Sequence, residues 1–216
     1  MGNIHFATIA IMAVNVLVSL KGFNDTSFFE RYKFGVGAIN AGQKERMLTS
    51  GFLHVDLSHL FFNMFTLYFF ADVVINWFGP GKFIGIYFIS LIAGSLLALL
   101  FHKDEPYYSA VGASGAVTGI LYAAILLQPE MSLYLMFIPI PIPAYVVGIG
   151  YLLYSIYGMK SRSDNIGHTA HFGGAIGGYV ATLILMPDLL FTETIMVILL
   201  AIPIIILFVM EKMGKI

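Results

Sequence analysis

Cysteine is absent from the 216 residues, so the chain has no disulfide framework, no thiol nucleophile and no thiolate metal site. Charged residues are also scarce, at 11% of the chain, whereas soluble domains carry about 25%. The formal net charge of −1 gives no electrostatic basis for binding nucleic acid. Apolar residues, in contrast, make up 59% of the chain, and the mean hydropathy of +0.88 predicts a multi-pass membrane protein.

Long apolar segments predict a helical bundle, because a spanning helix needs about 20 largely apolar residues. Seven candidate segments lie at about 4–20, 54–78, 82–101, 114–127, 141–158, 168–186 and 194–210. The stretch FGPGK at 78–82 predicts a tight hairpin between the second and third segments. The N-terminus has no basic region and no clear cleavage site, so we interpret the first segment as a span rather than a signal peptide. The length favours one domain over 1–216.

Residues 21–53 form the longest interruption between the apolar segments. Charged residues such as Lys21 and Arg31 alternate there with aromatic residues such as Phe28 and Tyr32. This interleaving favours a segment that lies on the membrane surface. A plain solvated loop is the alternative.

The fourth apolar segment is unusually short. From Ser114 to Leu127 it has 14 residues, which make about 20 Å of helix, whereas the hydrocarbon core is about 30 Å thick. If Gln128 and Pro129 mark one membrane surface, Ser114 stops roughly 10 Å short of the other. The free N–H groups at such a helix start cannot face lipid. The sequence therefore predicts that Ser114 lines a wet pocket.

Polar residues inside the apolar segments are candidates for function. They are His54, His59, Asn63, Asp72, Ser114, Thr118, His168 and His171. His59 and Asn63 are four residues apart and share a helix face, so both can donate hydrogen bonds to the same region. Asp72 has no second carboxylate for a two-aspartate mechanism, and the HExxH and Walker motifs are absent.

Small residues next to Ser114 allow two interpretations. Gly115, Gly119 and Ala123 form a stripe typical of packing between membrane helices. Matching stripes in the sixth segment are Ala170, Gly174, Gly178 and Gly173, Gly177, Ala181. Helices lined in this way can bring His171 within about 2.6–3.2 Å of a serine hydroxyl. Nucleophile, base and paired donors would form an acyl-transfer site; the alternative is packing with an interhelical hydrogen bond and no chemistry.

Four stretches together resemble the rhomboid intramembrane serine proteases. They are ERMLTSGFLHVDLSHLFFNMF (45–65), FGPGKFIGIYFISLIAGSLLA (78–98), VGASGAVTGI (111–120) and HTAHFGGAIGG (168–178). The resemblance covers most of residues 45–186, the expected catalytic core. It implies an all-α polytopic bundle of six spans, to which 194–210 would add a seventh at the C-terminus.

The resemblance implies a catalytic dyad that needs no metal and no cofactor. Ser114 would be the nucleophile, and His171 the general base and acid. His59, Asn63 and the backbone N–H of Ser114 would form the oxyanion site.

Other motif positions match the family in part. Gly112 corresponds to the first glycine of the family's GxSG motif, and His54 to a histidine that we expect to be structural. No family role carries over to His168. Arg46 falls where the family's first loop has a Trp-Arg pair, but Glu45 replaces the Trp, so a different anchoring of this loop is expected.

Thr118 is a second departure from the family pattern. Many relatives carry an aromatic residue at this position, which stacks on the catalytic histidine. The nearest aromatic residue on the same helix face is Tyr122. Either another ring supports His171, or the orientation of His171 is looser than usual.

These features predict an intramembrane serine endopeptidase that cleaves peptide bonds in or near transmembrane segments of other proteins. Its partners would be those substrates and the lipid bilayer. Two other classes stay open. One is a non-catalytic rhomboid-like binder of transmembrane segments, and the more remote one is a proton or solute carrier with His59, Asn63 and His171 as its polar relay.

Two arguments about membrane orientation disagree. Five of the 11 Lys and Arg residues lie in 21–46, and positive-inside reasoning places this loop and the serine-bearing face in the cytoplasm. The resemblance implies a site that opens to the outer side, in a bacterial cell membrane. We expect the outward arrangement. If residues 21–46 lie in the membrane interface, the positive-inside rule, which applies to loops outside the membrane, does not apply to their charges.

Overall fold

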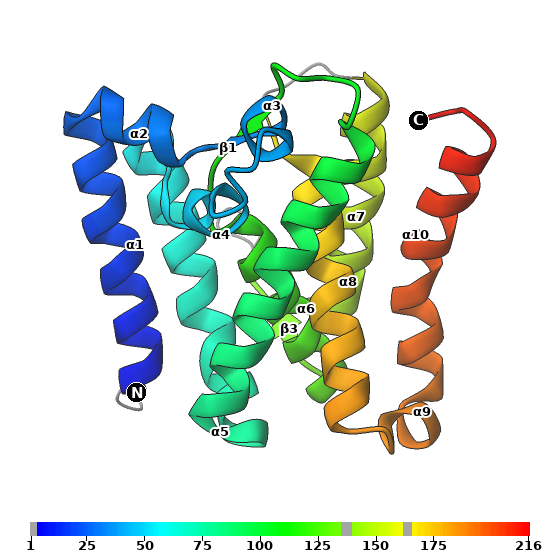
Figure 1. Cartoon of the computed structure of the whole chain (residues 1–216). Helices are drawn as coiled ribbons and strands as arrows, with labels where there is room; N and C mark the ends of the chain where they lie inside the picture. Colours follow the sequence, from blue (N-terminus) through cyan, green and yellow to red (C-terminus); the bar gives the residue numbers. More distant parts are fainter. Residues whose placement is uncertain (1–3, 135–139, 162–165) are drawn as a thin grey trace.

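The computed structural model describes residues 4–134, 140–161 and 166–216, which form a bundle of long helices (Figure 1). The long helices are α1 (Phe6–Asn24), α5 (Leu57–Phe101), α6 (Ser114–Leu127), α7 (Ala144–Ser161), α8 (His168–Leu185) and α10 (Thr194–Lys212). Their bounds lie within a few residues of the predicted apolar segments. The all-α class is confirmed.

The predicted hairpin at 78–82 lies inside α5. Gly79 has φ +78° and ψ 166°, which is not helical, and Pro80 follows it. Glycine tolerates a positive φ, and proline suits the first turn of the helix that follows. Two apolar helices therefore meet at Gly79 and run in opposite directions, as Figure 1 shows in cyan and green.

Short elements connect the long helices. They are α2 (Thr26–Tyr32), β1 (Phe34–Gly35), α3 (Val36–Asn40), α4 (Arg46–Thr49), the 3₁₀ helix η1 (Ser50–Phe52), β2 (Ser109–Ala110), β3 (Ser132–Leu133), β4 (Ile142–Pro143) and α9 (Leu189–Thr192). The strands pair antiparallel, β1 with β2 and β3 with β4. Phe34 pairs with Ala110, so the first loop (residues 25–56, between α1 and α5) is hydrogen-bonded to the segment that precedes Ser114.

Helix α6 lies at the centre of the bundle, with every residue from Gly115 to Leu127 buried. A Cβ atom on Gly174 would overlap the carbonyl oxygen of Gly115, and one on Gly178 would overlap that of Gly119. One glycine stripe of α8 therefore packs directly on the α6 backbone. The other stripe faces α5, where a Cβ on Gly177 would lie 2.9 Å from Ser90 Cα. Close approach on both sides of α8 follows from these stripes.

Helices α1, α5 and α10 have the length and apolar composition needed to cross a membrane. Large apolar side chains on the outer helices are exposed, including Phe6 on α1 and Ile195 on α10. Such an apolar surface is expected where helices face lipid. Figure 1 shows α1 beside the first half of α5, and α10 at the opposite side of the bundle.

Candidate active site

Ser114 is the first residue of α6 and follows a loop that is held from two sides. Gly112 has φ +127°, a conformation that favours glycine, and a Cβ there would lie 2.7 Å from the His59 ring. The Gly112 N–H donates a hydrogen bond to the Ser50 carbonyl at 3.0 Å. The Ala113 N–H donates to His54 Nε2 at 3.4 Å. The loop therefore presents Ser114 at a fixed position.

His54 is buried and connects three parts of the chain. Its Nε2 accepts the Ala113 N–H, and its Nδ1 lies 2.8 Å from the Ser19 hydroxyl of α1. An imidazole that accepts at Nε2 carries its proton on Nδ1, so His54 donates to Ser19. Ser19 in turn donates to the Phe52 carbonyl at 3.0 Å. His54 thus links α1 to the loop that precedes Ser114.

Ser114 and His171 form the central contact of the site. Ser114 Oγ lies 2.7 Å from His171 Nε2, although the residues are 57 positions apart. His171 lies in the first turn of α8, one turn before Gly174. Since Gly174 packs on the α6 backbone, the two helices are close enough for this hydrogen bond. The distance is within the range required for proton transfer between a hydroxyl and a base.

A tyrosine of α7 contacts the other nitrogen of His171. Tyr151 Oη lies 2.7 Å from His171 Nδ1. The two rings also stack, with centroids 5.5 Å apart and planes inclined by 28°. Tyr122, the aromatic residue nearest in sequence, instead donates a hydrogen bond to the Gly148 carbonyl at 2.9 Å. Of the two alternatives at Thr118, the structure therefore has another ring beside His171.

Sequence reasoning missed Tyr151, because the fifth apolar segment contains several tyrosines and no motif. The structure shows which face of α7 carries it. A Cβ on Gly148 would lie 2.7 Å from Ile125 of α6, so Gly148 marks the face of α7 that packs on the core. Tyr151 lies three residues later on the same face.

A cavity of about 1040 Å³ opens at this site. Its polar lining includes His59, Asn63, Ser114, Thr118, Tyr151 and His171. The predicted donors and the predicted dyad therefore line one cavity. Asn63 Nδ2 donates to the His59 carbonyl at 2.9 Å, and an amide nitrogen carries a second N–H for a ligand. As the first residue of the helix, Ser114 also has a backbone N–H without an intrahelical partner.

Of the three other candidates, Thr118 lines the cavity, whereas His168 and Asp72 do not. His168 is buried, with its ring edge-on to that of His171 at 6.1 Å. The Thr118 hydroxyl donates to the Ser114 carbonyl at 2.7 Å. Asp72 is not among the residues that line the cavity. Within the described part of the chain, no group of three or more His, Asp or Glu residues could hold a metal ion.

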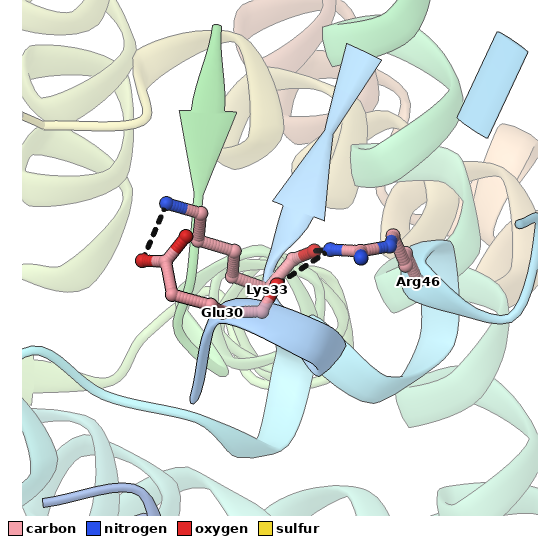
Figure 2. A network of polar contacts seen from close by, with 3 residues as sticks. All are labelled: Glu30, Lys33 and Arg46. Atoms are coloured by element: carbon pink, nitrogen blue, oxygen red, sulfur yellow. Dashed lines mark hydrogen bonds and ion pairs between the residues drawn. The ribbon is translucent and has the colours of Figure 1, made fainter. Parts of the chain in front are cut away.

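Arg46 anchors the first loop, as Figure 2 shows. Its Nη1 donates to the carbonyl oxygens of Glu30 and Lys33, at 2.8 and 2.9 Å, and its Nε donates to Gln43 at 2.7 Å. The two carbonyls lie at the end of α2, where helices leave such groups unpaired. Lys33 pairs with Glu30 at 2.8 Å and lines the cavity. Arg46 thus positions one wall of the cavity even though Glu45 stands where the family has a Trp.

The bundle of apolar helices places the chain in the class of polytopic membrane proteins, and a hydrogen-bonded Ser–His pair lines its cavity. The chain belongs to the rhomboid family, since the family's Rhomboid domain matches residues 41–188. It is 30% identical over 188 residues to RHOMBOID-like protein 12, mitochondrial, of Arabidopsis thaliana, a match that covers 80% of this chain and 56% of that protein.

Two further relatives match the same region. Rhomboid protease GluP of Bacillus subtilis is 35% identical over 145 residues, 66% of this chain and 26% of that protein. Rhomboid protein 1, mitochondrial, of Saccharomyces cerevisiae is 30% identical over 138 residues, 62% of this chain and 40% of that protein. The chain thus spans less than two thirds of the length of these relatives. An integral, multi-pass membrane location is confirmed, whereas the expected bacterial cell membrane is not supported, because relatives include mitochondrial proteins.

Proposed function

We propose that the chain is an intramembrane serine endopeptidase with Ser114 as its nucleophile and His171 as its general base. The observation that carries the proposal is the 2.7 Å contact between Ser114 Oγ and His171 Nε2 inside a cavity of a membrane bundle. A relative that is named a protease supports it at the family level. The whole of residues 1–216 acts as one domain, with the catalytic core over 45–186.

The reaction proceeds in two stages. His171 Nε2 takes the proton of the Ser114 hydroxyl while Oγ attacks the carbonyl carbon of the scissile bond, and negative charge develops on the carbonyl oxygen. His171 then gives that proton to the leaving amine as the C–N bond breaks. In the second stage His171 takes a proton from water, the hydroxide adds to the acyl carbon, and Ser114 leaves with its proton restored.

Donors around the cavity stabilise the oxyanion. Asn63, His59 and the Ser114 backbone N–H are the candidates, and removal of one such donor in other enzymes costs about 10²–10³ in turnover. Asn63 is held by its bond to the His59 carbonyl. His59 lies against Gly112, the residue whose missing side chain leaves space for the imidazole.

Substrates are transmembrane segments that reach the site as helices, because lipid forces the backbone to pair internally. Attack by Ser114 requires an extended backbone, so a turn of the substrate helix must open first. Gly and Pro reduce helix stability by about 1 and 3 kcal/mol relative to Ala. Cleavage is expected near the outer end of a segment that carries Gly or Pro downstream. Equal cleavage in liposomes after each of these residues is changed to Leu would exclude helix opening as the selective step.

Two rival functions need no activated serine. A binder of transmembrane segments uses only the cavity, and a carrier uses only a polar relay. An aryl phosphonate, which phosphonylates activated serine hydroxyls with loss of its aryloxide group, distinguishes a hydrolase from both rivals. The purified protein should label covalently, and both Ser114→Ala and His171→Ala should abolish labelling, since an unassisted hydroxyl is a weak nucleophile.

A matched control is Ser132→Ala, which removes an exposed hydroxyl outside the cavity. This variant should label at the parental rate. Labelling that persists in Ser114→Ala would disprove the assignment of the nucleophile. An unlabelled parent protein that still captures transmembrane peptides would favour the binder.

A further inference from the structure

We infer that Tyr151 is a positioning residue for His171: its hydroxyl fixes the tautomer and the ring orientation of the base, so that the site works with a third polar member. The inference rests on the proposed function, in which His171 accepts the Ser114 proton. It concerns the nitrogen that faces away from Ser114, on which the proposed chemistry makes no direct demand.

The contacts of Tyr151 meet the two requirements of such a role. A positioning group must reach the distal nitrogen of the imidazole, and Tyr151 Oη lies 2.7 Å from His171 Nδ1. It must also restrain the plane of the ring, and the Tyr151 ring is stacked at 28° to it. A single side chain of α7 thus restrains both rotation of His171 and its protonation pattern.

The order of donors follows from the role of Nε2. To accept the Ser114 proton, Nε2 must be unprotonated, so neutral His171 carries its proton on Nδ1 and donates it to Tyr151 Oη. Tyr151 Oη accepts in this arrangement, so its own hydroxyl proton points away from Nδ1. The Thr118 hydroxyl donates its proton in a hydrogen bond to the Ser114 carbonyl at 2.7 Å.

The productive arrangement uses each nitrogen of His171 once. The Ser114 hydroxyl donates to Nε2, and Nδ1–H donates to Tyr151 Oη. In the opposite tautomer Nε2–H would donate to Ser114 Oγ, and Nε2 would have no lone pair with which to take the serine proton. The role of Tyr151 is therefore to offer its oxygen as the acceptor for Nδ1–H.

Thr118 contributes to this arrangement by its size. Its short side chain leaves the space beside His171 to a ring from α7. Tyr151 thus compensates for the aromatic residue that the family has at the position of Thr118. Because a phenol is neutral near pH 7, Tyr151 orients the imidazole without adding charge.

The position of α7 consequently affects the base. Helices α5, α6 and α8 make most of the inter-helix contacts, and α7 packs against them from outside. A displacement of α7 would move Tyr151 away from Nδ1 while leaving the Ser114–His171 pair on its own helices.

The first test replaces only the hydroxyl. Tyr151→Phe keeps the ring and should lower kcat roughly 3- to 10-fold with KM within about twofold, as expected for loss of one neutral hydrogen bond. Tyr122→Phe is the matched control, since it also removes a phenol that bonds a partner inside the bundle but touches no part of the dyad. It should lower thermal stability and leave kcat within about twofold.

The second test reads the tautomer directly and needs no turnover. Nitrogen-15 NMR of histidine-labelled protein, assigned with His171→Gln, should show a protonated Nδ1 and an unprotonated Nε2 in the parent. Tyr151→Phe should shift both signals toward a mixture of tautomers, whereas Tyr122→Phe should leave them unchanged. Parental tautomer populations in Tyr151→Phe would overturn the inference.

The two proposals fail separately. Loss of phosphonate labelling in the parent would remove the proposed function while the NMR signature could still be present. Labelling of the parent together with an unchanged kcat in Tyr151→Phe would remove only the role of Tyr151.

A swap variant adds a positive test: Tyr151→Leu should lose activity, and Thr118→Tyr in the same chain should restore part of it by supplying a ring from α6. Absence of any restoration, with the double variant folded, would also count against a positioning role.

Discussion

A methyl group added to Gly174 should separate the two helices that carry the dyad. The Cβ of Gly174→Ala would overlap the Gly115 carbonyl and lie 2.8 Å from Gly115 Cα, which is 0.6 Å short of ordinary contact at 3.4 Å. Because the carbonyl oxygen is nearer still, α6 and α8 must separate by roughly 1 Å at this point, an overpacking that costs about 1–3 kcal/mol. Gly174 is three residues from His171, so the separation acts directly on the contact between Ser114 and His171.

The consequence for chemistry follows from the same displacement. The Ser114–His171 distance of 2.7 Å would increase beyond the roughly 3.2 Å at which a base can take the proton. A misplacement of about 1 Å costs on the order of 10²-fold in rate. Gly174→Ala should therefore label with a phosphonate about 100-fold more slowly and melt at a lower temperature.

A glycine without neighbours provides the control for this prediction. Gly85 lies on the second half of α5, and a Cβ there would meet nothing within 4 Å. Gly85→Ala should label at the parental rate and gain up to about 1 kcal/mol in stability from helix propensity. If Gly174→Ala labelled as fast as Gly85→Ala, the dyad would not depend on the close packing of α6 and α8, and the reasoning would be wrong.

Three further predictions concern the surroundings of the dyad. Asn63→Ala should lower kcat by about 10²–10³ with KM nearly unchanged, and a kcat within about threefold of the parent would remove Asn63 from the oxyanion site. Thr118→Phe should overpack the space that Tyr151 occupies, with a loss of about 1–3 kcal/mol in a chemical or thermal melt; an unchanged melt would show that the space is open. Arg46→Ala should increase hydrogen exchange over residues 26–35, because it leaves two carbonyls at the end of α2 without their donor, while Arg46→Lys should restore part of the protection.

Much of the bundle could be predicted from hydrophobic runs and turn residues. The apolar segment that begins at Ser114 predicted the bounds of α6, and FGPGK predicted the reversal at Gly79, where a positive φ is required. The glycine stripes indicated close packing, because small residues repeated every four positions are typical of helices whose backbones approach closely. The short elements of 21–53 were not predicted, because their helices are only a few residues long and depend on pairing with residues 109–110.

The candidate site could be predicted where its residues lie on helices that pack closely through glycines. Ser114 and His171 are positioned by glycines that can be read from the sequence, because the absence of a side chain allows two helices to approach closely. Tyr151 depends instead on the rotation of α7, which follows from the close packing of Gly148 on Ile125 of α6. A contact between residues of two different helices has no spacing signature within either helix. The residue that completes the environment of His171 could therefore be identified only once the packing of α7 on α6 was known.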